Sequence, residues 1–593
     1  MMIKEKIEKL RQLMKENKID AYVIPSFDAH QSEYVAYHWK SREWVSGFTG
    51  SAGTVVITLH DAGLWTDGRY YIQAEKQLQD SGIRLFRMAD VGTPSYTDWL
   101  NDVLNEGSSV GFDGSVFSVD MVNSLKMAFK SKKIAIKMDK DLIDLLWHDR
   151  PAIPTNAMFV HDVKYAGISR TEKFNIIRKE MNKKGANYYL LTSLDDIAWL
   201  LNIRGSDVPN NPVVICNVIL SLDKCYLFID SSKVPNSVRL ELQSDKVEFK
   251  SYTDVQQFLK SMASSDKIMF DPNMTNALLY NSININVTKL QISNITLNLK
   301  AVKNKTEIAN LKCCELSDGV AMVKFIKWLK TSINEEHITE LSASDKLQQL
   351  RKKDELCVGL SFDTIAGYKE HAAMMHYIPK IETTSTLENR GLFLVDSGGQ
   401  YFNGTTDITR TIVLGNLTEE EKSDFTLVLK SHIALATAKF LYGATGSNLD
   451  VIARQPIWKY GLDYKCGTGH GVGFFLNVHE GPQRLSQVPN DIKIEEGMIL
   501  TNEPGIYKEG KHGVRTENMM IVVNDEKTEF GQFMKFETIT YCPIDLDGIN
   551  KNMLTESELE WLYTYNKNVF TKLSPYLNHE ERSWLNAEIM GDN

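Results

Sequence analysis

Two stretches far apart in the chain share the same order of hydrophobic and polar positions. Apolar residues at helical spacing over residues 3–17 predict a helix, which leads into an apolar strand at 21–24. The same pattern returns as a predicted helix over 170–184 followed by a strand at 188–191. Each copy then continues into a tryptophan- and glycine-containing segment and a further strand that ends in aspartate. A repeat of this length predicts two related α/β domains.

The pattern changes after about residue 303. A long amphipathic helix is predicted over 306–330, and short apolar strands separated by glycines and acidic residues follow it. We expect a mixed α/β (α+β) protein with related domains at 1–153 and 154–302 and a different third domain at 303–593.

The composition is that of a folded globular protein, with 593 residues, 43% hydrophobic and 24% charged. A net charge of −9 provides no basic field for nucleic acid or for an anionic membrane, so neither is an expected partner. No apolar run of about 18 residues and no secretory-type segment occurs, which predicts a cytoplasmic protein. The seven cysteines are odd in number and lack a C-x-x-C pair, so we expect reduced thiols.

An acidic pair marks the first strands of the third domain. Asp396 closes the apolar strand 392–395, and Asp407 opens the strand 408–413. Two antiparallel neighbours with a tight connection would bring both carboxylates to one cleft. Taken singly, each aspartate is more typical of a turn that it caps. The pair becomes informative only together with further ligands.

A glycine-rich segment, 467–473, carries a single histidine, His470. Glycines there allow the backbone to approach another group closely. The spacing fits neither the G-x-G-x-x-G dinucleotide motif nor a P-loop, which needs a following Lys-Ser or Lys-Thr. We interpret His470 as a candidate metal ligand, although a lone histidine is more often a hydrogen-bonded structural residue.

Two glutamates next to apolar strands complete the candidate site. Four carboxylates that converge would have to take up protons unless cations compensate them. Two divalent cations balance the four charges, and oxygen ligands with one imidazole suit Mn²⁺ or a similar hard ion. Two such ions about 3.5 to 4 Å apart activate water for hydrolysis. The five candidate ligands are Asp396, Asp407, His470, Glu503 and Glu517.

The ligand order Asp, Asp, His, Glu, Glu resembles that of the pita-bread metallopeptidases, which include methionine aminopeptidase, prolidase and aminopeptidase P. The segments 404–411, 477–482 and 502–505 are similar to those of the three-domain, cytosolic type of Xaa-Pro aminopeptidase. The resemblance covers essentially the whole chain. It implies two creatinase-like N-terminal domains and a pita-bread catalytic domain, with a C-terminal extension that starts near 543–547.

The resemblance also implies how the ligands share two divalent ions, for which we expect Mn²⁺. Asp396 would hold one ion, and Asp407 and Glu517 would bridge both. His470 and Glu503 would each complete one coordination shell.

Further positions match residues that face the substrate in the family. His376 and His479 match imidazoles that contact the scissile carbonyl or move protons, and Tyr507 and Arg515 match residues that line the site. Glu503 is the expected acid or base that helps to deliver a proton to the proline nitrogen.

One position departs from the family pattern. Cys466 stands four residues before the metal-binding histidine, where the family often has a second histidine. We expect its thiol to pack against the proline ring as a small apolar group and to have no catalytic role.

The implied reaction is hydrolysis of an N-terminal Xaa-Pro bond by a hydroxide that two metal ions activate, with a histidine stabilising the oxyanion. Prolidase, which cleaves Xaa-Pro dipeptides, uses the same ligands, but such chains usually carry one N-terminal repeat. Methionine aminopeptidase resembles the third domain only. An inactive binding relative and metal-free creatinase-like chemistry are disfavoured because all five ligands are present. The expected partners are peptides with proline at position two and a second copy of the chain in a homodimer.

Overall fold

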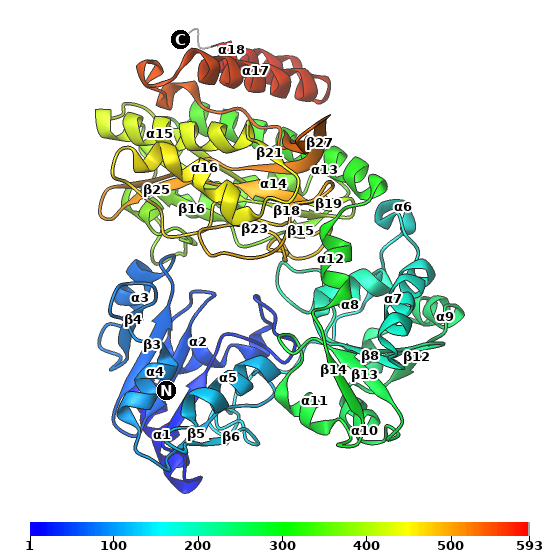
Figure 1. The fold of residues 1–593 in the computed structure, drawn as a ribbon. Coiled ribbons are helices and arrows are strands. Elements are labelled where there is room, and N and C mark those ends of the chain that lie inside the picture. The colour runs from blue at the N-terminus through cyan, green and yellow to red at the C-terminus, as the bar shows by residue number, and fades with distance from the viewer. Residues whose placement is uncertain (591–593) are drawn as a thin grey trace. The chain divides into compact units, whose positions relative to one another are not determined.

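The computed structural model describes residues 1–590 and divides into two compact units. The first unit holds residues 1–163 and 168–297, and the second holds 164–167 and the chain from residue 298 onward. Both units mix helices and strands, which confirms the expected fold class (Figure 1). The domain boundaries expected at 153 and 302 stay predictions.

The first N-terminal domain is a twisted sheet with the strand order β4-β3-β2-β1-β5-β6, covered by helices. The predicted strand at 21–24 is β1, which pairs parallel to β5 and antiparallel to β2. The strands are β1 (Ala21–Ile24), β2 (Thr54–Thr58), β3 (Ala62–Thr66), β4 (Arg84–Arg87), β5 (Ser109–Gly111) and β6 (Ala135–Lys137). The helices are α1 (Ile3–Glu16), η1 (Tyr37–Trp39), α2 (Ser41–Ser46), α3 (Tyr71–Gln77), α4 (Tyr96–Val103) and α5 (Val119–Phe129).

The second N-terminal domain repeats this sheet, with the order β12-β11-β10-β8-β13-β14, which confirms the repeat that the sequence predicts. The strands are β7 (Phe159–Val160), β8 (Tyr188–Leu191), β9 (Ile203–Arg204), β10 (Asn217–Ser221), β11 (Cys225–Phe228), β12 (Val247–Lys250), β13 (Lys267–Phe270) and β14 (Thr288–Gln291). The helices are α6 (Val163–Ala166), α7 (Arg170–Lys184), α8 (Leu194–Leu201), η2 (Ser231–Lys233), α9 (Asn236–Ser244), η3 (Tyr252–Asp254), α10 (Val255–Lys260), α11 (Ala277–Ser282) and α12 (Ile295–Ala301).

Local signals explain why α7 has the bounds that the sequence predicts. The Ser169 side chain accepts a hydrogen bond from the backbone N–H of Glu172, and the Glu172 carboxylate accepts one from the backbone N–H of Ser169, which closes a capping box. Gly185 ends the helix with φ +66°, a conformation that a glycine adopts without strain.

The second unit begins with the long helix α13, close to the predicted range 306–330. Its helices are α13 (Lys305–Ser332), α14 (Glu340–Arg351), η4 (Lys369–Ala373), α15 (Glu419–Ala436), α16 (Gly446–Trp458), η5 (Leu546–Gly548), η6 (Lys551–Met553), α17 (Glu556–Leu573), η7 (Ser574–Tyr576) and α18 (His579–Met590). The strands are β15 (Cys357–Leu360), β16 (Ile365–Tyr368), β17 (Leu392–Ser397), β18 (Gly399–Tyr401), β19 (Gly404–Thr405), β20 (Ile408–Val413), β21 (Lys439–Leu441), β22 (Gly469–His470), β23 (Arg484–Leu485), β24 (Ile499–Asn502), β25 (Gly505–Lys508), β26 (His512–Arg515), β27 (Asn518–Thr528) and β28 (Gly531–Thr538).

Several small sheets build this unit. β17 lies between β16 and β20, and β27 lies between β28 and β24. β17 and β20 are antiparallel, as predicted, but their connection is not a tight turn, because β18 and β19 lie within it and pair with each other. Asp396 lies inside β17 opposite Thr409, one position before the strand ends.

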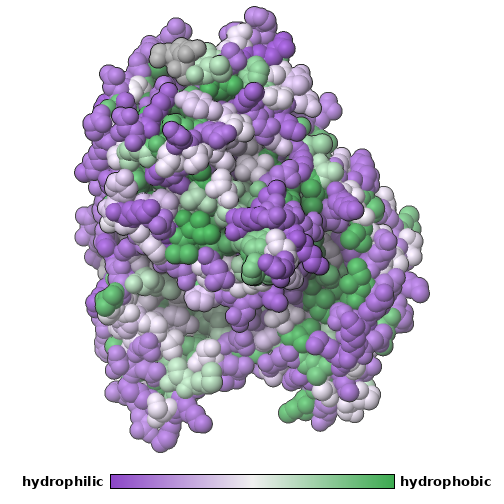
Figure 2. Space-filling model, turned by 45° about the horizontal axis from the view of Figure 1, so that its top comes forward, coloured by the Kyte–Doolittle hydropathy of each residue, from purple (hydrophilic) through white to green (hydrophobic). Residues whose placement is uncertain are grey.

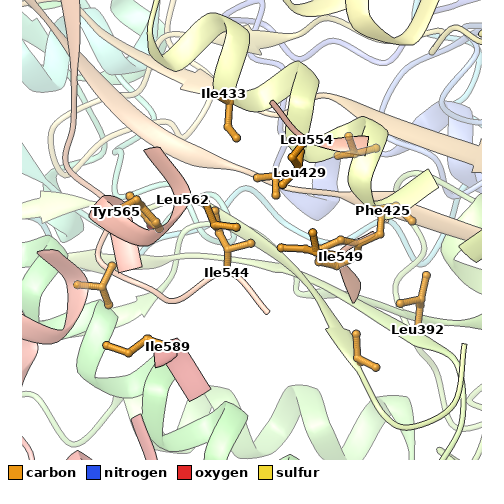
Figure 3. Packing of buried hydrophobic residues seen from close by; sticks show 14 of the residues in the cluster. Leu392, Phe425, Leu429, Ile433, Ile544, Ile549, Leu554, Leu562, Tyr565 and Ile589 are labelled. Atoms are coloured by element: carbon orange, nitrogen blue, oxygen red, sulfur yellow. The ribbon is translucent and has the colours of Figure 1, made fainter. Parts of the chain in front are cut away.

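The C-terminal helices α17 and α18 lie side by side, drawn in red in Figure 1. They share a hydrophobic core with α15, in which Leu562 lies beside Ile544 (Figure 3). Burying a side chain of this size stabilises a fold by roughly 1.5 to 3 kcal/mol. The C-terminal segment is therefore packed into the second unit as part of its core.

Hydrophilic side chains cover most of the face drawn in Figure 2, with smaller hydrophobic areas between them. Within residues 1–590, the structure has no helix with the length and apolar character that a membrane crossing needs. All seven cysteines lie in this range and none is in a disulfide, as expected.

Candidate active site

The five predicted ligands lie in, or directly next to, five strands of the second unit: β17, β20, β22, β24 and β27. Asp396 lies in β17, and Asp407 directly precedes β20, the antiparallel neighbour of β17. Glu517 directly precedes β27, and its amide donates a 3.1 Å hydrogen bond to the carbonyl oxygen of Thr409 in β20. These contacts hold Asp396, Asp407 and Glu517 on adjacent strands.

The glycine-rich segment brings the imidazole to these carboxylates. The His470 amide donates to the Thr501 hydroxyl at 3.1 Å, and the Glu503 amide donates to the Thr468 carbonyl at 2.8 Å. A Cβ atom at Gly469 would lie 2.0 Å from the carbonyl oxygen of Thr501. Only glycine permits this approach, which is the role that the sequence suggested for the segment.

The imidazole faces two of the carboxylates. His470 Nε2 lies 3.3 Å from Asp407 Oδ2 and 3.4 Å from Glu503 Oε1. Its Nδ1 is 2.9 Å from the carbonyl oxygen of Gly471, which can only accept, so Nδ1 carries the hydrogen. Nε2 is therefore the nitrogen available to a metal ion. Ligand atoms of Asp407, His470 and Glu517 all lie within 4.8 Å of one another.

The carboxylates perturb one another's acidity. Burial, and then the charges of Asp407 and Glu503, raise the pKa of Glu517 well above its ordinary value. Burial raises the pKa of Asp396 to about 7; Arg515 opposes this shift, and the neighbouring carboxylates add to it. Burial lowers the pKa of His470, but the hydrogen bond to Asp407 and the nearby Glu503 outweigh it and bring the pKa to about 9. The site is crowded with negative charge.

The donor set fits divalent cations. Asp396 Oδ1 and Glu517 Oε1 are buried carboxylate oxygens that have no hydrogen-bond partner among residues 1–590. A buried carboxylate oxygen without a partner is costly, and a bound cation removes that cost. Carboxylate oxygens with one imidazole are ligands for a hard or borderline divalent ion.

The other predicted site residues surround this set. Arg515 donates to Asp396 Oδ2 at 2.7 Å, to the Tyr507 hydroxyl at 2.7 Å and to the carbonyl of Met375 at 3.2 Å. His376 follows Met375 directly in the chain. The rings of His479 and His470 meet edge to face, with centroids 4.2 Å apart. Their roles toward a substrate remain predictions.

The departure at position 466 lies at the edge of the same site. Cys466 and Tyr507 both pack, partly buried, against one hydrophobic cluster. The Cys466 carbonyl accepts a hydrogen bond of 2.6 Å from Arg454 Nη2, which fixes the backbone here. An apolar contact of this thiol with a proline ring remains a prediction.

Sequence reasoning missed Thr409. Its hydroxyl donates to Glu517 Oε2 at 2.7 Å and accepts from Arg515 Nε at 3.1 Å, so it orients both side chains. Its place two residues after Asp407, in the segment 404–411, was the one available signal.

Known families match the chain from end to end. Residues 309–524 match metallopeptidase family M24, and 532–590 match the C-terminal region of that family. Residues 6–143 and 149–307 each match the creatinase/prolidase N-terminal domain.

Individual relatives agree with these families. The chain is 41% identical to Xaa-Pro aminopeptidase 1 of Dictyostelium discoideum, over 99% of this chain and 96% of that protein. It is 38% identical to aminopeptidase P2 of Arabidopsis thaliana, over 98% of this chain and 88% of that protein.

A solved structure matches the whole fold. The crystal structure of an X-prolyl aminopeptidase from Caenorhabditis elegans, described as a cytosolic enzyme with a dinuclear active site, superimposes with a TM-score of 0.95. The two chains are 33% identical, and the match covers 99% of each. With its paired creatinase-type domains and its acidic site, this chain belongs to metallopeptidase family M24, among the Xaa-Pro aminopeptidases.

Proposed function

We propose that the chain removes the first residue from peptides whose second residue is proline. The observation that carries this proposal is the convergence of four carboxylates and one imidazole on neighbouring strands, with two buried carboxylate oxygens left without partners. The named activities of the relatives from Dictyostelium, Arabidopsis and Caenorhabditis support it.

The five ligands would hold two divalent ions, and we propose Mn²⁺. Asp396 would bind one ion, Asp407 and Glu517 would bridge the pair, and His470 and Glu503 would complete the two shells. The oxygen-rich donor set supports this choice. When bound, the ions supply Lewis acidity and a water molecule activated near neutral pH.

Side chains beside the ligands would handle the substrate and its protons. His479, whose ring meets that of His470, and His376, which follows Met375 in the chain, would donate a hydrogen bond to the oxygen of the scissile carbonyl. Glu503 has one-fifth of its side chain exposed, so it can exchange a proton with the leaving proline nitrogen.

A proline at position two requires a dedicated pocket. The nitrogen of the scissile bond carries no hydrogen and the ring fixes φ, so a peptidase that grips the backbone N–H at this position loses its contact. We assign the ring to the surface near Tyr507 and Cys466. Arg515 holds the Tyr507 hydroxyl at 2.7 Å and so fixes that ring as one wall.

The test uses the purified protein stripped of metal and reloaded with Mn²⁺. Release of the first residue is measured on Arg-Pro-Pro, Arg-Pro and Met-Ala-Ser, with Glu517→Gln as the inactive control. We expect metal-dependent cleavage of Arg-Pro-Pro that the variant lacks. Cleavage of Arg-Pro alone would indicate a prolidase, and cleavage of Met-Ala-Ser a methionine aminopeptidase. Mn²⁺ binding without any cleavage would indicate an inactive relative.

We also propose that the protein works in the cytoplasm as a homodimer. The description of the Caenorhabditis relative as a cytosolic enzyme supports the location. Large exposed hydrophobic side chains in and just after α16, namely Val451, Trp458 and Tyr460, support association with a second copy. Fractionation of cells and light scattering on the purified protein test the two statements, and a monomeric mass would contradict the second.

A further inference from the structure

A buried arginine lies directly behind the carboxylate cluster. Arg410, in β20, follows Asp407 by three residues and is 3% exposed. Its Nη1 donates to the carbonyl oxygen of Glu517 at 2.7 Å, and its Nη2 donates to Asn518 Oδ1 at 2.7 Å. The guanidinium therefore fixes the main chain of one predicted metal ligand and the side chain of the next residue.

The C-terminal helix α17 supplies a partner for this arginine. The hydroxyl of Tyr565 accepts a hydrogen bond of 2.9 Å from Arg410 Nη2. The same hydroxyl can donate to the carbonyl oxygen of Cys542, at 2.9 Å, or to that of Thr540, at 3.0 Å. Tyr565 is 7% exposed, and it belongs to the hydrophobic cluster that contains Leu562 on the same helix (Figure 3).

A histidine extends the network to the second glutamate. Asn518 Nδ2 lies 3.1 Å from His432 Nε2, and His432 Nδ1 lies 3.0 Å from the carbonyl oxygen of Asn502. Because that carbonyl can only accept, Nδ1 carries the hydrogen and Nε2 accepts from Asn518. Burial, and then the charge of Arg410, lower the pKa of His432 to about 3, so the ring stays neutral.

The network therefore reaches both strands that present glutamate ligands. Asn518 directly follows Glu517, and Asn502 directly precedes Glu503. The Asn502 side chain returns a 2.9 Å hydrogen bond to the carbonyl oxygen of His432, which locks α15 to β24. Linked hydrogen bonds in a buried region restrict one another's geometry.

An aromatic side chain of α17 fixes the tyrosine in turn. Trp561 stacks on Tyr565 with centroids 5.3 Å apart and an interplanar angle of 2°. The same indole meets the His432 ring at 5.9 Å in an edge-to-face arrangement. Trp561 of α17 thus contacts both Tyr565 and His432, which are two members of the buried hydrogen-bond network.

We propose that Tyr565 is a positioning residue for the metal centre, acting through Arg410 and Asn518 on Glu517 and through His432 on the strand that carries Glu503. The inference rests on the proposed function, because it takes these glutamates as metal ligands. It gives the C-terminal region a part in the reaction besides its packing. Groups that orient metal ligands contribute strongly to affinity even though they never touch the ion.

The experiment compares Tyr565→Phe with the wild type by calorimetric titration of Mn²⁺ into the full-length, metal-free protein. Removing the hydroxyl frees Arg410 Nη2 from one of its acceptors, and we expect at least one ion to bind about tenfold more weakly. The electron paramagnetic resonance spectrum at saturating Mn²⁺ should change as well, since Glu517 would be a ligand of both ions under the proposed function. Tyr563→Phe, on the same helix but 38% exposed, is the matched control and should match the wild type in both measurements.

Equal Mn²⁺ affinity and an unchanged spectrum in Tyr565→Phe would overturn the inference, whatever the thermal stability of the variant. Arg410→Lys is a second test variant. It keeps the positive charge but can donate to fewer acceptors, so it should weaken Mn²⁺ binding more than Tyr565→Phe does. A wild-type chain that binds fewer than two Mn²⁺ ions would overturn the assignment of the ligands themselves. No peptide enters the titration, so failure of the proposed cleavage and failure of the positioning role are told apart.

Discussion

Two clusters of buried charge, one in each unit of the molecule, are balanced in opposite ways. In the first unit, Asp207 and Lys233 form a single pair at 2.7 Å, with side chains 0% and 2% exposed. In the second unit, four carboxylates crowd together and Arg515 pairs with only one of them, Asp396. A charge paired within the chain serves the fold alone, whereas surplus negative charge has to be balanced by cations from solution. The surplus marks the functional site.

Two histidines, one in each unit, show a similar contrast. In the first unit, His30 has neutral partners, the carbonyl oxygen of Thr192 at 2.8 Å and the hydroxyl of Tyr252 at 2.9 Å, and burial lowers its pKa. In the second unit, the carboxylates around His470 bring its pKa to about 9 despite burial. The surroundings therefore decide whether an imidazole is structural or ready to exchange a proton for a metal ion.

The largest expected effect comes from Glu517→Gln. Loss of a group that merely orients a ligand costs about 10- to 100-fold, so loss of a carboxylate that we propose bridges both ions should lower kcat/KM by more than about a hundredfold. The metal-free variant should be at least as stable as the metal-free wild type, because an amide cannot ionise next to the other three carboxylates. Peptide cleavage measures the loss of kcat/KM, and thermal unfolding measures the stability of the metal-free variant. Full activity would show that Glu517 is not a ligand.

A change of carboxylate to amide in the first unit, Asp207→Asn, should lower stability and leave metal binding unchanged. Asp207→Asn leaves Lys233 buried without its counter-charge, which costs about 3 to 5 kcal/mol of unfolding free energy. Calorimetric Mn²⁺ titration at a temperature where the variant is folded should give the wild-type affinity. Urea unfolding measures the first effect. Unchanged stability would remove the contrast between the two units.

The third prediction concerns pH. Asp396, with a folded pKa of about 7, and His470, at about 9, both hold protons at pH 6 in the metal-free protein and must lose them to bind a metal. Mn²⁺ affinity should therefore rise from pH 6 to pH 9, with protons released on binding. Calorimetry in buffers of different ionisation enthalpy counts these protons. A pH-independent affinity would contradict the crowding of charge in the site.

The metal-free fold should respond to pH in the opposite direction. The pKa of Asp396 is raised above its ordinary value of 3.8, so the group costs stability as pH rises from about 4 to about 7. The pKa of His470 is raised above 6.5, so its contribution is complete below that pH and is lost as pH rises through about 9. The melting temperature should fall with pH without metal, and saturating Mn²⁺ should remove that slope.

Local sequence patterns predict the helices and strands of this protein, but they do not predict the side-chain contacts that lie behind the candidate metal ligands. The helix α7 and the strand β20 have the predicted bounds, because periodicity and caps are local signals. Arg410 and Tyr565 are 155 residues apart, and nothing near either in the sequence connects them. His432 reads as one polar residue of an amphipathic helix until Asn502 and Asn518 are folded against it.

The smallest expected effect comes from removing a neutral hydroxyl group, that of Thr409, which contacts one of the crowded carboxylates. Thr409→Val keeps the side-chain shape but removes the hydroxyl that donates to Glu517 Oε2 at 2.7 Å and accepts from Arg515 Nε. Because Glu517 keeps its charge, we expect a loss of only about tenfold in kcat at saturating Mn²⁺. Thr426→Val is the control, since that buried hydroxyl donates to the carbonyl of Lys422 in α15. Equal losses of kcat in both variants would trace the effect to packing, whereas a loss confined to Thr409→Val would show that the orientation of the Glu517 carboxylate limits turnover.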